Sequence, residues 1–290
     1  MTTMKNWLRC SIMMAFVLPA VAAGGQSVPA LKPQAAASPG TRTAFVSVFN
    51  VGPGVSEPVL IPIRVHLTSA HECTERVDGK VTLSFIVDSH GLARELGFES
   101  ATGTDLDGVA HKLVEAYRFK PAMRGGVPVA AAEQVDLGLQ GCRGQVKSAN
   151  GQLHSITKLI AQPVQRLSPF KLAPEDLPYA LAERAGSIGA GKTLEKVSKG
   201  SGVEPPRILK SVDAVYSEEA RAKKINAVVL AKVIVDPQGM PRCARVTSPM
   251  GYGLEGQALK AIRQFRFKPA TRNGIAVPVM MTLEVVFRMA

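Results

Sequence analysis

The chain has 290 residues, of which 46% are hydrophobic and 20% are charged. This composition is that of an ordinary globular protein, with enough chain for one large domain or two small ones. The formal net charge of +12 favours acidic partners such as nucleic acid, anionic lipid headgroups or anionic polymers of a cell envelope.

The N-terminus has the pattern of a secretory signal peptide. Lys5 and Arg9 precede an apolar run over residues 10–23, which ends in small residues suited to cleavage. The run is shorter than the roughly 20 residues of a membrane-spanning helix and contains Pro19, so we predict that residues 1–23 are removed. An uncleaved membrane anchor is the alternative. Export argues against nucleic acid and leaves acidic components of the envelope.

Two segments precede the first clear domain. Residues 24–42 are rich in Ala, Pro, Gly and Ser and are predicted to be a flexible leader. Apolar residues then gather and alternate between residues 44 and 66, which indicates one or two strands that extend the first domain. We find no counterpart of this segment in the second half of the chain.

An internal repeat fixes the domain count. The run Arg-Phe-Lys-Pro-Ala at residues 118–122 recurs at residues 266–270, an offset of 148 residues (266 minus 118). Flanking positions match at the same offset without a gap. The sequence therefore contains one domain twice. We predict a first domain over residues 43–142 and a second over residues 205–290.

Each copy is predicted to be a small α+β domain, a three-stranded antiparallel sheet covered by one or two helices. Alternating apolar residues predict a first strand that ends at Asp88 or Asp236, and a turn and a second strand follow. Helical spacing predicts a helix after the second strand, with Arg-Phe-Lys-Pro-Ala as its end because proline cannot continue a helix. Alternation over residues 277–287 predicts the last strand. Ser217 is expected to cap an additional helix in the second copy.

The order of these elements also predicts which strands are neighbours. A helical crossover makes strands two and three parallel, so strand one can lie between them and strand three is left at an edge. The start of strand one then lies beside the end of strand three. In the first copy these ends carry Cys73 and Cys142, which we predict to form a disulfide. Cys10 is removed with the signal, and Cys243 is a free thiol or an intermolecular partner.

Residues 143–204 separate the copies and contain four dispersed prolines. They are predicted to be a linker, in which a short helix is indicated over residues 175–184. Within the linker, residues 186–193 match the phosphate-binding loop of nucleotide hydrolases in full. Such a loop follows a buried strand and opens a helix, whereas the flanking residues here indicate loop. We interpret it as a Gly-rich linker and keep an enzyme that uses Lys192 only as an alternative.

The remaining chemistry-bearing residues are dispersed. The five histidines show no metal-ligand spacing, and no catalytic constellation recurs in both copies. We therefore predict no catalytic residue, no metal and no cofactor. Basic residues follow the helix of each copy, and in the second they are Arg263, Arg266, Lys268 and Arg272. They either favour the negative end of the helix dipole or form a docking patch for anionic envelope material.

The second copy resembles the TonB C-terminal domain family. The resemblance covers residues 205–290 well and residues 72–142 more weakly. It rests on Pro205-Pro206-Arg207-Ile208, Tyr216-Ser217-Glu218-Glu219-Ala220, Val235-Asp236-Pro237-Gln238-Gly239, Leu254-Glu255, Phe267-Lys268-Pro269-Ala270, Gly274 and the terminal apolar strand.

The resemblance implies a non-enzymatic periplasmic module that grips a short extended segment of an outer-membrane receptor and transmits force from an inner-membrane proton channel. The last strand is the family's pairing edge, and an exposed edge is a template for strand addition on physical grounds. Met280 and Val286 on its outward side suit a peptide or a partner domain. The edge maps onto Val277, Val279, Met280, Met281, Thr282, Leu283, Glu284, Val285, Val286 and Phe287.

The sequence also departs from the energy transducers of that family, since it shows neither their long anchor nor their proline-rich spacer. We therefore expect a periplasmic adaptor that binds an outer-membrane receptor or another envelope protein, or that associates with itself. An energy transducer held in the inner membrane by an uncleaved N-terminal segment is the alternative.

Overall fold

The computed structural model describes residues 43–65, 67, 73, 75–147, 153–184, 193–198 and 200–289. All of these belong to one unit, residues 41–290. The predicted signal peptide and leader lie outside the described residues, as does the Gly-rich loop apart from Thr193.

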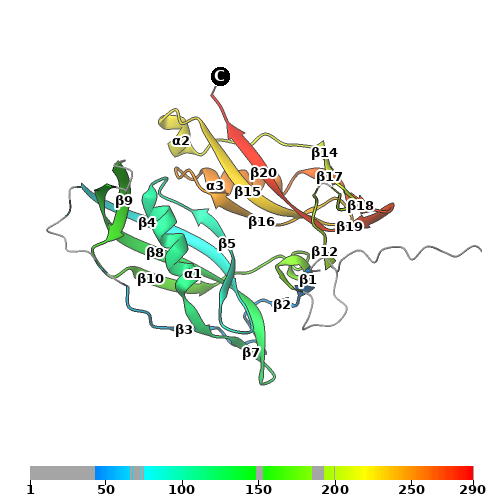
Figure 1. The fold of residues 1–290 in the computed structure, drawn as a ribbon, viewed down its shortest axis with the longest axis horizontal. Coiled ribbons are helices and arrows are strands. Elements are labelled where there is room, and N and C mark those ends of the chain that lie inside the picture. The colour runs from blue at the N-terminus through cyan, green and yellow to red at the C-terminus, as the bar shows by residue number, and fades with distance from the viewer. Residues whose placement is uncertain are drawn as a thin grey trace, which may run out of the picture. The chain divides into compact units, whose positions relative to one another are not determined.

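The two copies have the same central elements, which confirms the predicted α+β class (Figure 1). In each, the first strand lies between the other two and antiparallel to both. The first copy consists of β4 (Glu75–Val87), β5 (Ala93–Ser100), α1 (Asp105–Ala116) and β8 (Val127–Lys147). The second consists of α2 (Glu218–Ala222), β15 (Ala227–Val235), β16 (Pro241–Ser248), α3 (Leu254–Ile262) and β20 (Val279–Phe287).

Apolar side chains of the sheet and the helices form a shared core. Leu83 and Phe85 on β4 and Val229 and Val233 on β15 are almost completely buried, as the alternation predicts. Ser217 caps α2 as expected, since its hydroxyl accepts the backbone N–H of Ala220.

Residues shared by the two copies hold the hairpin turn against a following strand. The buried carboxylate of Asp236 accepts two backbone N–H groups of its own turn and bonds Arg242 Nε at 2.8 Å, and Asp88 makes the equivalent contacts. Gly239 has a φ of 76°, and a Cβ there would lie 1.9 Å from the carbonyl oxygen of Phe267. The repeated sequence motifs therefore anchor the turn.

The Arg-Phe-Lys runs are strands, so the prediction that they end the helices was wrong. β6 (Arg118–Lys120) pairs with β3 (Val59–Ile61), and β17 (Arg266–Lys268) pairs with β14 (Arg207–Lys210). The helices end earlier because backbone pairing with a distant segment extends these residues. β3 and β14 are also counterparts at the 148-residue offset, which corrects the expectation that the N-terminal segment has none. Their sequences differ too much for the repeat to be seen there.

Other N-terminal residues do not simply extend the first domain. β1 (Thr43–Val46) pairs with β11 (Leu181–Arg184) and β12 (Thr193–Leu194), and Phe45 packs edge-on against Tyr179. β2 (Val48–Phe49) pairs in parallel with β8. The helix predicted over residues 175–184 is instead a single 3-10 turn, η2 (Leu177–Tyr179), followed by β11.

Part of the segment predicted as a linker is folded onto the first copy. β9 (Leu153–Leu159) and β10 (Val164–Pro169) both pair antiparallel with β8. β8 itself continues past Cys142, the residue expected to follow its end. The linker prediction failed here because β9 and β10 are stabilised by pairing with β8 rather than by an apolar pattern of their own. The remaining short strands are β7 (Ala122–Arg124), β13 (Val203–Glu204), β18 (Ala270–Arg272) and β19 (Ile275–Val277).

The copies also meet edge to edge. β5 pairs antiparallel with β16 through Phe98 and Val246, which joins both sheets in the strand order β10-β8-β4-β5-β16-β15-β20. A Cβ on Gly97 would lie 2.6 Å from Cβ of Arg245, so the two strands approach closely. Arg245 also forms an ion pair with Glu95 across this junction.

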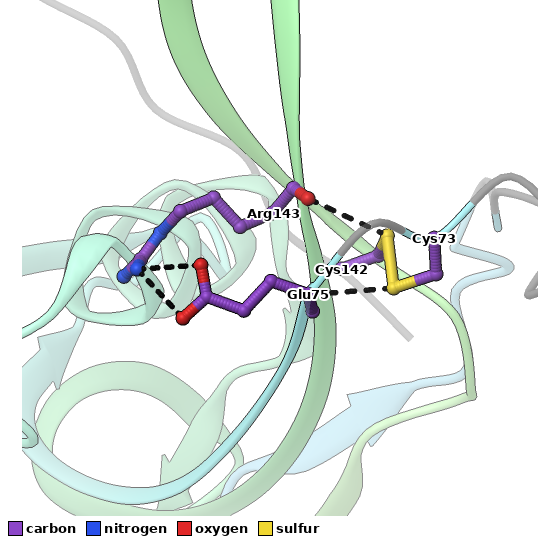
Figure 2. The surroundings of a disulfide bond; sticks show 4 residues. All are labelled: Cys73, Glu75, Cys142 and Arg143. Atoms are coloured by element: carbon purple, nitrogen blue, oxygen red, sulfur yellow. Dashed lines mark hydrogen bonds and ion pairs between the residues drawn. A yellow bond between two sulfur atoms is a disulfide. The ribbon is translucent and has the colours of Figure 1, made fainter.

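Cys73 and Cys142 form a disulfide, which confirms the predicted pair (Figure 2). Their Cα atoms are 5.3 Å apart, within the range of protein disulfides. Beside them, the Arg143 guanidinium donates to both carboxylate oxygens of Glu75, at 3.1 and 3.0 Å. Both contacts tie the beginning of β4 to β8.

Candidate functional site

The candidate site is the free edge of β20. One side of β20 pairs with β15 from Val279, opposite Val235, to Phe287, opposite Ala227. On the other side, the only described contact is a parallel bridge between Glu195 and Val279. Within the described part of the chain, the edge from Met280 to Phe287 therefore has no strand beside it.

The direction of the backbone groups on β20 follows from that single bridge. The Glu195 N–H donates to the carbonyl oxygen of Pro278 at 2.9 Å, so residue 278 directs its backbone oxygen to the open side. Backbone groups alternate between the two sides of a strand, so Met280, Thr282, Glu284 and Val286 also direct theirs outward. Beyond the Glu195 bridge, the groups of Thr282, Glu284 and Val286 have no partner strand among the described residues, and such a row is a template for another strand.

The side chains of β20 alternate between two environments. Leu283, Val285 and Phe287 are buried on the helix-covered face, and the Phe287 ring contacts the Tyr216 ring edge-on at 5.5 Å. Thr282, Glu284 and Val286 lie on the opposite face and are exposed. Val286 is 45% exposed and pairs with Val228 of β15, itself 42% exposed. Val286 and Val228 thus form a small apolar surface on this face, next to the open edge.

Two residues of the predicted edge lie elsewhere or are covered. Val277 is not on β20: it ends β19 and pairs with Ala270 of β18. Pro278 separates the two strands, which an alternating apolar pattern cannot reveal. Met280 is half-buried and packs with the cluster of Phe45, Tyr179 and Ile234. The predicted outward apolar surface is therefore reduced to Val286 and its neighbour on β15.

The predicted basic patch contains two arginines that make internal contacts. Arg266 donates to the carbonyl oxygens of Phe265, at 2.6 Å, and Arg263, at 3.3 Å, just after α3. It therefore satisfies groups near the negative end of the helix. Arg272 forms an ion pair with Glu195 at 2.8 Å. Arg263, Arg266 and Lys268 are exposed and Arg272 is half-buried, and a docking role for the patch stays a prediction.

Cys243 has the environment of an unreactive thiol. It donates to the carbonyl oxygen of Asp176 at 3.3 Å, and burial raises the pKa of the thiol far above its ordinary value. It lines a cavity of about 70 Å³ together with Glu95, Asp176 and Arg245. This volume holds a few water molecules and is too small for a typical organic ligand.

Among the described residues, no three or more His, Cys, Asp or Glu side chains gather in a way that could bind a metal ion. In the same part of the chain, every helix is too short or too polar to span a membrane.

The first copy has the corresponding edge closed, which sequence reasoning missed. The outer side of β8 is occupied by β10 along Glu133–Gly138 and by β9 along Gly141–Lys147. Among the residues that the structure describes, neither strand has a counterpart next to β20. The signal that could have revealed β10 is weak, because only Leu167 and Ser168 among its residues are even half-buried.

Comparison with known families gives a match within the second copy. Residues 212–289 match the family model described as Gram-negative bacterial TonB protein C-terminal. The matched segment contains α2, β15, β16, α3 and the whole of β20. A search of curated proteins gave no significant match.

Proposed function

We propose that the chain is a non-enzymatic envelope protein whose β20 edge binds an extended segment of a partner protein by strand addition, because residues 212–289 match the TonB C-terminal family model. Domains of this family are periplasmic in Gram-negative bacteria and interact with outer-membrane receptors. The observation that carries the proposal is the row of backbone groups from Thr282 to Val286, which has no partner strand among the described residues.

The partner is a periplasm-facing extended segment of an outer-membrane receptor or of another envelope protein. The first copy does not offer a second site of this kind, because β10 and β9 occupy the edge of β8. We therefore assign it the role of a scaffold that holds the second copy, with one partner segment per chain. The match to a transport-related family supports this assignment over an enzymatic role.

A proline at Thr282 tests strand addition directly. The Thr282 N–H is directed to the open side, so Thr282→Pro removes a donor needed by an added strand without removing a hydrogen bond to β15. Thr282→Val is the matched control, since it keeps the N–H and the branched shape. The measurement is fluorescence anisotropy of labelled peptides that span the periplasm-facing segments of the host's outer-membrane receptors.

We expect the wild type and Thr282→Val to bind at least one such peptide with similar affinity. Thr282→Pro should bind the same peptide at least about tenfold more weakly, which corresponds to the loss of one or two hydrogen bonds. Circular dichroism and thermal unfolding verify that the proline variant is folded. Equal affinity of a folded Thr282→Pro variant would show that the partner does not pair with β20.

A further inference from the structure

The strand that closes the first copy shows how the edge of the second can be filled. β10 runs antiparallel to β8, from Val164 opposite Gly138 to Pro169 opposite Glu133. At the 148-residue offset, residues 133–138 of β8 correspond to residues 281–286 of β20. The backbone groups agree as well: Ala132 directs its carbonyl oxygen to the N–H of Phe170, and its counterpart Met280 is one of the outward-directed residues.

The strand order of the sheet is symmetric about its middle over three strands on each side. Phe98 pairs with its own counterpart, Val246, so the three strands on each side are related by a local two-fold axis. In the described part of the chain, the order continues to β10 at one end and stops at β20 at the other. Among the described residues, no strand lies next to Met281–Val286 in the place that this symmetry relates to β10.

Building on the proposed function, we infer that the partner strand runs antiparallel to β20 across Met281–Val286 and carries an apolar, a basic and an apolar residue opposite Val285, Glu284 and Leu283. Strand addition alone leaves the orientation, the register and the side-chain chemistry of the partner strand undefined.

The two apolar positions follow from the helix-covered face. In the first copy, Leu167 of β10 lies opposite Val135 and packs on the core, and Gln165 accepts a hydrogen bond from the buried Tyr117 hydroxyl. Burial raises the pKa of Tyr117 to about 12, which keeps this hydroxyl a donor. Its counterpart in the second copy is Phe265, which has no hydroxyl. A polar side chain there would lose its partner, so the position favours an apolar one.

The basic position follows from the exposed face. Arg166 of β10 lies opposite Asp136, and the counterpart of Asp136 is Glu284. Glu284 lies opposite Leu230 of β15. Among the described residues, Glu284 forms no ion pair. A basic residue on the added strand would supply the missing cross-strand charge.

The probe is a fluorescent peptide with the sequence of residues 161–170, Ala-Gln-Pro-Val-Gln-Arg-Leu-Ser-Pro-Phe, which includes β10, in the form Gln165→Leu. Its affinity for the full chain is compared with that of the unchanged peptide and of a peptide that also carries Arg166→Glu. The protein variants are Thr282→Pro and Glu284→Lys.

We expect the Gln165→Leu peptide to bind at least about fivefold more tightly than the unchanged peptide, because the Gln165 amide would have no hydrogen-bond partner beside Phe265 whereas a leucine needs none. Adding Arg166→Glu weakens binding to the wild type, and Glu284→Lys restores it. A spin label at the peptide N-terminus should broaden the NMR signals of Val286 and Phe287, because Val164 is expected opposite Val286.

Three results would overturn the inference. Broadening at Met281 would mean a parallel strand, and broadening at β8 would mean exchange with β10 in the first copy. A dimer of the full chain that Thr282→Pro abolishes would mean that the edge is taken by a second copy.

The inference and the proposed function fail separately. If none of the three peptides binds the full chain at a concentration of about 1 mM, where even very weak affinity would be detected, the inferred register and chemistry of the partner strand are wrong. Receptor segments that bind in a Thr282-dependent manner would still support strand addition.

Discussion

Phe98 of β5 pairs across the sheet with Val246 of β16, its own counterpart in the second copy (246 minus 98 is 148). Residues that meet their own counterparts are the mark of an isologous contact, as between the two subunits of a symmetric dimer. Here both halves belong to one chain. The contact closes the β5 and β16 edges against each other, and β10 closes β8, which leaves β20 as the open end of the sheet.

A first prediction concerns this junction. Gly97→Ala places a Cβ 2.6 Å from Cβ of Arg245, so β5 and β16 must separate. We expect the free energy of unfolding to fall by about 1–3 kcal/mol, the usual cost of overpacking. Gly108→Ala is the control, because its Cβ would point into open space on helix α1. That variant should be unchanged or up to about 1 kcal/mol more stable. Urea denaturation of both variants measures the difference, and equal stabilities would contradict the close approach.

A second prediction concerns the disulfide. Cys73 and Cys142 close a loop with a sequence separation of 69 residues. In the chain-entropy model such a cross-link stabilises the folded state by about 4 kcal/mol. The double variant Cys73→Ala/Cys142→Ala should therefore unfold at a lower denaturant concentration than the oxidised wild type. Cys243→Ala, which leaves the disulfide intact, is the control. An unchanged midpoint for the double variant, against a wild type proven oxidised by mass spectrometry, would show that the bond adds no stability.

A third prediction is a pH dependence set by Glu133. This β8 side chain is 4% exposed, and one of its carboxylate oxygens has no hydrogen-bond partner. Burial, and then the charge of Glu57, raise the pKa of Glu133 from 4.5 to about 8. Above pH 4.5 the unfolded chain releases this proton while the folded chain keeps it. Stability should therefore fall as the pH rises from 4.5 to about 8 and level off above that.

Glu133→Gln should remove this contribution, because the amide is neutral at every pH. The measurement is the free energy of unfolding between pH 5 and pH 9, about the range over which the carboxyl changes its charge in the two states. Glu284→Gln, an exposed carboxylate on β20, is the control. If the wild type and Glu133→Gln lose stability equally across this range, Glu133 is not the group responsible.

A fourth prediction concerns the N-terminus. Cleavage of residues 1–23 is expected from the basic start and the short apolar run. The intact mass of the protein from its native envelope, together with fractionation, measures this. A shortened chain in the periplasmic fraction agrees with an adaptor. A full-length chain in the inner membrane would instead favour an energy transducer that acts on outer-membrane receptors, and would direct the search to a proton-channel partner.

Much of the local structure is determined by the sequence alone. Alternation and helical spacing predict the strands and helices of both copies, because a side chain faces the core or the solvent according to its place in the repeat. The turn residues shared by the two copies have a local physical reason, since Asp236 must bind its own turn and Gly239 must approach Phe267. The disulfide followed from strand order, because a central strand one brings Cys73 beside Cys142.

The tertiary structure alone decided which edges are closed. β10 has almost no apolar pattern of its own and is a strand because β8 offers it unpaired backbone groups. The same kind of long-range pairing turned the Arg-Phe-Lys run into β17 and placed Val277 on a different strand from β20. Backbone hydrogen bonds are the same for every residue type except proline, so the sequence carries little record of them. That is why the sequence predicted an edge position for the last strand of both copies but could not show that β10 and β9 close this edge in the first copy.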